Sequence, residues 1–123
     1  MPAPIVFFDI AGPDMKSQAA FYAAVFDWEV SAQGHIAPPA VSPLPGMLRV
    51  EAAAGFQPER VLYLGVDDIT ATLVTITANG GAVVFPRMVV PGVVILALFT
   101  DPAGNRMGLV EMADGRAIVP PAG

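Results

Sequence analysis

The chain has 123 residues, six Lys and Arg against eleven Asp and Glu, and a formal net charge of −5 at pH 7. This length suits one domain with a single sizeable core, and scattered basic residues on an acidic chain exclude the electrostatic signature of a nucleic-acid-binding protein. The absence of cysteine excludes a disulfide framework, a thiolate nucleophile and a thiolate metal site.

The chain begins with a predicted strand over Ile5–Ile10, which is rich in β-branched and aromatic residues. No basic segment precedes this apolar run, so a secretory signal is not indicated and we expect a cytoplasmic protein. Asp14 is a suitable N-cap for a helix that begins at Met15, because its carboxylate can accept the first backbone N–H groups. Periodicity extends this helix to about Phe26 and places one apolar arc on it: Phe21, Tyr22, Val25 and Phe26.

The following segment, Trp28–Gly55, is rich in proline and contains only short apolar pairs. This pattern favours two or three short edge strands joined by turns, the clearest over Met47–Ala52. A longer strand is predicted over Val61–Val66.

Local signals conflict over Ile69–Thr77. Its β-branched residues favour a strand. Asp67 and Asp68 nevertheless form an N-cap, Ile69, Leu73 and Ile76 share a helical face, and an Asn-Gly-Gly sequence follows as a helix stop. We therefore predict a helix.

The last third of the chain is predicted to be β-structure. It contains a strand over Ala82–Phe85, a kink at Pro86, a buried run over Val93–Phe99 and a last strand over Arg106–Met112, with residues 114–123 as a loose or late-packing tail. The longest apolar run is interrupted by Pro and Gly and is too short to span a membrane, so no membrane partner is expected.

The order of these elements indicates an internal repeat. A strand, a helix and two or three strands are followed by a strand, a helix and three strands, which is a βαβββ unit used twice. The predicted fold is α+β, with residues 1–123 as one domain, module one at about 4–55 and module two at about 60–113. Each module would form a small sheet with its helix on one face, and the two would pair around a cleft.

Three stretches carry a resemblance to a known family: "FFDIAGPDMKSQAAFYAAVFDW", "YLGVDDITATLVTITANGGAVVFP" and "TDPAGNRMGLVE". They resemble the glyoxalase/bleomycin-resistance/extradiol-dioxygenase group, also called the vicinal oxygen chelate superfamily. Asp27 stands where that family usually has Gly, and Asp tolerates the left-handed conformation that a helix end can require.

In metal-using members of this family, the resemblance implies a divalent ion held by His and Glu from four strands. The corresponding positions here are Phe7, Val61 and Gly108, and the fourth falls on Met47, Arg49 or Glu51. A divalent cation needs three or four nitrogen or oxygen donors, which Phe, Val and Gly do not supply. We therefore expect no metal and no cofactor.

The remaining polar candidates each have a structural alternative. Asp9, on the cleft side of its strand, is either an acid or base with a raised pKa or a partner for a turn or an Arg. His35, the only histidine, is better explained as a loop residue than as a general base. The other candidates are ligand contacts or acid–base groups that packing or solvation would explain more simply: Arg49, Glu51, Tyr63 and Arg106.

The resemblance leaves three classes of function open. The first is a metal-independent small-molecule binding protein of the bleomycin-resistance kind, holding an apolar or aromatic ligand in a cleft walled by Phe7, Val61, Tyr63 and Phe99. The second is a glyoxalase-like lyase, isomerase or dioxygenase that uses Asp9, Glu51 or Tyr63, or a metal site not recognised above. The third is an interaction module with a filled cleft. Because 54% of the residues are hydrophobic, we also expect a homodimer or a lined cavity.

Overall fold

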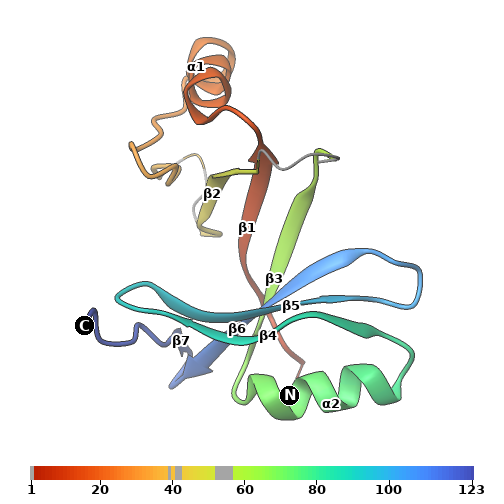
Figure 1. The fold of residues 1–123 in the computed structure, drawn as a ribbon. Coiled ribbons are helices and arrows are strands. Elements are labelled where there is room, and N and C mark those ends of the chain that lie inside the picture. The colour runs from red at the N-terminus through yellow and green to blue at the C-terminus, as the bar shows by residue number, and fades with distance from the viewer. Residues whose placement is uncertain (1, 39, 41–42, 52–56) are drawn as a thin grey trace. The chain divides into compact units, whose positions relative to one another are not determined.

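The computed structural model describes residues 2–38, 40, 43–51 and 57–123 and has an α+β fold of strands with two helices (Figure 1). The chain divides into two compact units. Unit 1 comprises Leu62–Gly123 together with the first residues up to Val6, and unit 2 comprises Phe7–Val61. No helix in the described part of the chain is long and apolar enough to cross a membrane.

Unit 1 is built on a mixed sheet. Strand β3 (Arg60–Val66) runs parallel to β6 (Arg106–Ala113), which pairs in antiparallel fashion with β5 (Val94–Thr100), and β5 pairs with the edge strand β4 (Ala82–Val90). A short strand, β7 (Arg116–Ala117), adds to the end of β6. The single helix of this unit, α2 (Ile69–Ala78), follows β3 directly.

The core of unit 1 lies between α2 and one face of this sheet. Ile69 and Leu73 of α2 pack with Ala97, Phe99 and Leu109, and all of these side chains are buried. The helix forms despite its β-branched sequence, because the Asp68 carboxylate accepts the Ala71 N–H at 3.0 Å as an N-cap.

Unit 2 has a smaller framework. Strand β1 (Ile5–Gly12) runs parallel to β2 (Gly46–Val50), and helix α1 (Met15–Phe26) begins after Asp14, whose carboxylate accepts the Ser17 N–H at 3.2 Å. Its core centres on Leu48 and Ile36, against which Met15, Ala19 and Tyr22 of α1 are packed. Between the helix and β2, two isolated bridges, Val30 with Ile36 and His35 with Met47, replace full strands.

The structure corrects the predicted role of the apolar arc on α1. No residue of this helix is fully buried, and Phe21, Val25 and Phe26 are more than half exposed. The aromatic side chains pack on one another instead, with Tyr22 stacked on Trp28 at 4.8 Å between ring centroids and Phe21 edge-on to Tyr22 at 5.2 Å. Apolar periodicity located the helix correctly but not the face that its core contacts.

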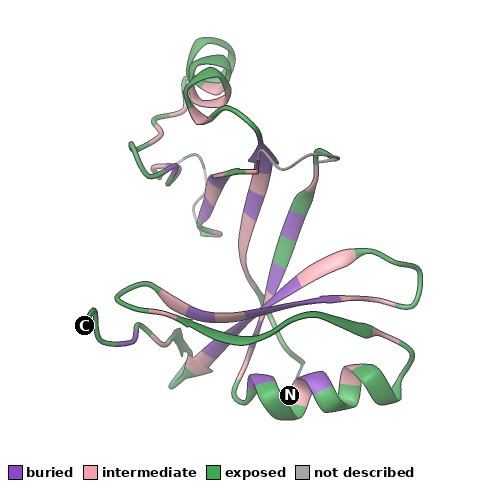
Figure 2. Ribbon diagram, viewed as in Figure 1, coloured by how far each residue is buried: buried purple, intermediate pink, exposed green. Residues whose placement is uncertain are grey.

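Three predicted boundaries also change. The expected strand Met47–Ala52 is β2, which ends at Val50, and Ala52 lies outside the described residues. Pro86 does not end its strand, since β4 continues through it with two register shifts and is exposed along most of its length (Figure 2). The tail, which was expected to be loose or to pack late, is packed in the structure. Strand β7 pairs with β6, Ile118 contacts the core, and the Pro120 carbonyl oxygen accepts the Gly92 N–H.

Candidate functional site

The register of unit 1 defines the face on which its family positions lie. Leu64 pairs with Leu109, and both side chains contact the core beneath α2. Successive residues of a strand point to opposite faces. Tyr63 and Gly108, which also pair with each other, therefore lie on the face away from α2.

The same reasoning applies to the paired strands of unit 2. Ile10 pairs with Leu48, and both belong to the core beneath α1. The neighbouring pair, Asp9 with Met47, lies on the face away from α1 and corresponds to Tyr63 with Gly108 in unit 1. Of the three positions that the sequence left open for the fourth ligand, Met47 is the one whose register matches that of Gly108, and we propose it as the fourth family position.

The residues at these positions do not fit a divalent metal. Phe7, Val61 and Gly108 carry no nitrogen or oxygen donor in their side chains, and the Met47 thioether is a soft, weak donor. A side chain at position 108 is also sterically excluded, because a Cβ there would lie 2.9 Å from Cγ of Tyr63 and closer still to two other ring carbons. In the described part of the chain, no three His, Cys, Asp or Glu residues converge as a metal site.

The space beside Gly108 is therefore filled by another side chain. Tyr63 lies over the glycine and is 7% exposed. The glycine allows the ring to approach the backbone of the neighbouring strand closely, which any Cβ would prevent.

Asp9 and Arg49 form the centre of a charge cluster on the corresponding face of unit 2. Arg49 Nε lies 3.2 Å from Asp9 Oδ2, Nη1 lies 3.0 Å from Glu51 Oε1, and Nη2 lies 2.8 Å from Glu59 Oε2. Asp9 is 1% exposed. The structure thus shows an Arg partner for Asp9, and the ion pair compensates this buried carboxylate. A role of Asp9 as an acid or base stays a prediction.

The sequence analysis missed Glu59 as a member of this cluster. It lies ten residues from Arg49 along the chain and just before β3. The Ala11 N–H donates to the Glu59 carbonyl oxygen at 2.9 Å, which holds this residue beside β1. The only signal in the sequence was its place directly before an apolar strand.

The remaining candidates are distributed differently from the expectation. Phe99 pairs with Met107 and packs in the core beneath α2, so it lies on the opposite face of the sheet from Tyr63 and is not a wall of the same surface. Phe7 is half-buried in β1, Val61 is fully buried in β3, and Arg106 is half-buried at the start of β6.

His35 is an exposed residue in the turn-rich segment, as predicted. Its backbone pairs with Met47, and its N–H donates to Ser31 Oγ at 3.1 Å. The sequence gave no sign of this pairing.

A second ionic pair, which the sequence analysis also missed, lies beside the core of unit 1. Glu111 accepts hydrogen bonds from Arg87 Nε at 3.1 and 3.0 Å and from Nη2 at 2.7 Å, and it accepts the Ile69 N–H at 3.1 Å. The Arg87 hydrogen bonds lower the pKa of the Glu111 carboxyl and outweigh the opposing effect of burial. This buried carboxylate thus connects β4 to the first turn of α2.

With this geometry in place, comparison with known proteins assigns the family. A family model described as a glyoxalase-like domain matches residues 5–110. The chain belongs to the glyoxalase-like family. It is a member of the vicinal oxygen chelate superfamily, as the resemblance predicted.

Solved structures agree with this assignment at the level of fold. One match is a methylmalonyl-CoA epimerase in complex with methylmalonyl-CoA and NH4+, which is 16% identical in sequence. The superposition covers 96% of this chain and 100% of the epimerase chain, with a TM-score of 0.65. The epimerase from Mycobacterium tuberculosis is 17% identical over 89% of this chain and 87% of its own, with a TM-score of 0.64.

A third structure, described as an NAD-dependent benzaldehyde dehydrogenase from Legionella pneumophila, is 11% identical, with coverage of 91% and 100% and a TM-score of 0.63. No curated protein matches the sequence. The chain therefore has the glyoxalase-like fold. Because proteins described as different enzymes share this fold, the chemistry has to be argued from the residues.

Proposed function

We propose that this glyoxalase-like protein binds an apolar or aromatic small molecule without a divalent metal. One observation carries the proposal: the ring of Tyr63 lies over Gly108, where metal-using relatives would place a carboxylate. The other three family positions, Phe7, Met47 and Val61, hold side chains that suit apolar contact better than coordination.

Within each unit, the proposed contact residues lie on the strand face turned away from the helix of that unit. They comprise the apolar positions just named, Tyr63 with Gly108, and the polar groups of Asp9, Arg49 and Arg106. Phe99 is not among them, because it packs beneath α2. A surface of mostly apolar groups with a few fixed polar side chains is typical of small-molecule sites, where the polar groups orient the ligand.

Metal binding by purified protein is the direct test. We expect no stoichiometric divalent ion by elemental analysis and no thermal shift with Ni²⁺, Zn²⁺, Mn²⁺ or Fe²⁺. The His35→Ala variant is the matched control, because it removes the only histidine and with it adventitious binding at the surface. A saturable shift of several degrees that persists in this variant would overturn the proposal. If no metal binds, a screen of hydrophobic antibiotics and thiol-adduct compounds would identify the ligand class.

An acid–base enzyme is the second candidate, and the placement of Asp9 favours it. This carboxylate is almost fully buried on the same strand face as Phe7, and it pairs with Met47. Arg49 holds Asp9 in one orientation, so proton transfer would require a substrate that competes for or works around this ion pair. Turnover of a thiol-adduct or acyl-thioester substrate that is lost in Asp9→Asn, with binding retained, would favour the enzyme.

We also propose that the chain forms a homodimer. Its exposed large apolar side chains include Phe21, Val25 and Phe26 on α1 and Phe85 on β4, each about half exposed or more. Such apolar surface is unusual for a monomer in water. Light scattering after size-exclusion chromatography tests this, and a monomeric mass at micromolar concentration would contradict it.

A further inference from the structure

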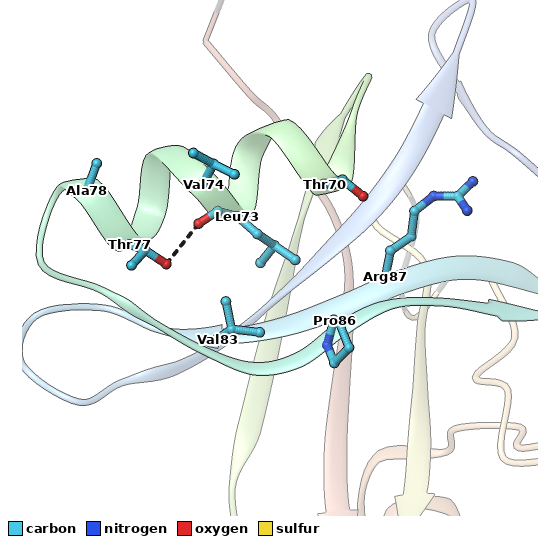
Figure 3. Close-up of a pocket in the computed structure, with 8 residues that line it drawn as sticks. All are labelled: Thr70, Leu73, Val74, Thr77, Ala78, Val83, Pro86 and Arg87. Atoms are coloured by element: carbon cyan, nitrogen blue, oxygen red, sulfur yellow. Dashed lines mark hydrogen bonds between the residues drawn. The ribbon is translucent and has the colours of Figure 1, made fainter.

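An apolar groove runs along unit 1 between α2 and β4 (Figure 3). Its volume is about 690 Å³, and its apolar lining comes from Leu73, Val74 and Ala78 of the helix and from Val83 and Pro86 of the strand. Small-molecule sites commonly occupy about 300–1,000 Å³. The groove is on the α2 side of the sheet, whereas Tyr63 and Gly108 are on the other side, so it is independent of the proposed function.

The walls of this groove offer few competing polar groups. The Thr77 hydroxyl donates to the Leu73 carbonyl oxygen at 3.1 Å, a bond within the helix that satisfies the hydroxyl donor (Figure 3). Pro86 has no backbone N–H to present. An apolar chain lying here would therefore bury little unsatisfied polar surface.

One end of the groove is polar. Arg87 lies there, and the hydroxyl of Thr70 points toward it from the first turn of α2 (Figure 3). Glu111 takes hydrogen bonds from Arg87 Nε and Nη2, and in the described part of the chain Nη1 enters no hydrogen bond. The Arg87 side chain is 38% exposed, against 11% for Glu111, so the cation and not its partner is available to solvent.

Glu111 also fixes the two walls relative to each other. The same carboxylate accepts the Ile69 N–H at the start of α2 and the Arg87 guanidinium from β4. A site whose walls are joined by a buried charged hydrogen bond is preorganised, which reduces the entropy lost when a ligand binds.

We propose that this groove binds a medium-chain carboxylic acid or a similar amphipathic molecule, with its apolar chain along Leu73, Val74 and Val83 and its carboxylate at Arg87 Nη1 and Thr70. The helix from Thr70 to Ala78 rises by about 12 Å, the scale of a medium-length alkyl chain. A flexible apolar chain fits a long open groove better than a compact polar metabolite does.

Decanoate binding to the full chain, measured by isothermal titration calorimetry at pH 7, tests the proposal. Val74→Gln should weaken binding about tenfold, because it replaces apolar contact with an amide. Val119→Gln is the matched control, since Val119 is 65% exposed, comparable with 69% for Val74, and lies in unit 1 outside the groove. Circular dichroism would establish that both variants remain folded.

The head-group interaction has its own test. Arg87→Lys keeps a positive charge beside Glu111 but removes the forked guanidinium, so decanoate affinity should fall several-fold while decanol affinity changes little. Equal losses in Val74→Gln and Val119→Gln, or no saturable binding of decanoate, would overturn the proposal. The proposal would also be overturned if the protein formed a dimer that dissociated in Val74→Gln but stayed intact with decanoate. A second copy of the chain would then cover the groove.

Discussion

Replacing Gly108 with Ala tests the close approach of Tyr63 to β6, on which the interpretation of the family metal position depends. The new Cβ would lie 2.9 Å from Tyr63 Cγ and closer to two other ring carbons. The ring is 7% exposed, so it has no room to turn outward. Overpacking of this kind lowers the free energy of unfolding by about 1–3 kcal/mol. Replacing Gly with Ala also reduces the conformational entropy of the unfolded chain, which raises the free energy of unfolding by about 0.5–1 kcal/mol. The central values of the two ranges predict that Gly108→Ala lowers the free energy of unfolding by about 1 kcal/mol.

Urea unfolding and thermal melts would measure this change, and the expected fall in Tm is about 5 °C. Gly12→Ala is the control, because the three atoms nearest to its Cβ would all belong to the flexible Gln18 side chain, with Cγ at 3.1 Å. In a Tyr63→Ala background the cost of Gly108→Ala should disappear, since the clashing ring is gone. The reasoning would be refuted if Gly108→Ala cost no more than Gly12→Ala, or if its cost persisted without the ring.

Two further predictions concern the ion pairs. The folded pKa of Glu111 is below its ordinary value of 4.5, so its pair with Arg87 stabilises the fold above that pH, and this contribution is lost as the pH falls through the lower folded pKa. Glu111→Gln should therefore lower the free energy of unfolding by about 1–3 kcal/mol at pH 7. In urea unfolding, the difference between this variant and wild type should shrink below pH 4.5. A constant difference from pH 7 to pH 3 would contradict this. Asp9→Asn should lower the free energy of unfolding by about 1–3 kcal/mol. Glu51→Gln should lower it by less than about 1 kcal/mol, because Glu51 is more exposed. Equal losses in the two variants would show that burial does not distinguish these partners of Arg49.

The sequence predicted both helices because capping chemistry is local. At α2, the decision between strand and helix depended on Asp68 and on Ile69 with Leu73, and the structure adds a reason why β-branched residues are tolerated. The hydroxyls of Thr72 and Thr75 donate to carbonyl oxygens one turn earlier, at 2.8 and 3.3 Å. Threonine can satisfy its hydroxyl in this way inside a helix, so β propensity was a weaker signal than the cap.

The features that the sequence did not predict depend on residues far apart in the chain. Arg87 and Glu111 are 24 residues apart, and Glu59 joins Arg49 only because β1 lies beside the start of β3. A strand was predicted to end at Phe85, before a kink at Pro86, but β4 continues to Val90. It is the edge strand of its unit, where a missing N–H costs no ladder hydrogen bond. Local patterns could not identify the edge strand, because that requires the pairing order.

The two modules show how a repeat constrains positions without fixing chemistry. Asp9 and Tyr63 occupy equivalent places in β1 and β3, and Arg49 and Val110 occupy equivalent places in β2 and β6. One module therefore carries a charge cluster where the other carries an aromatic ring over a glycine and an aliphatic side chain. Neither Met47 nor Gly108 offers a hard donor, and the Tyr63 ring occupies the space that a side chain at position 108 would need. A single Gly108→Glu substitution would therefore be expected to destabilise the fold without creating a metal site.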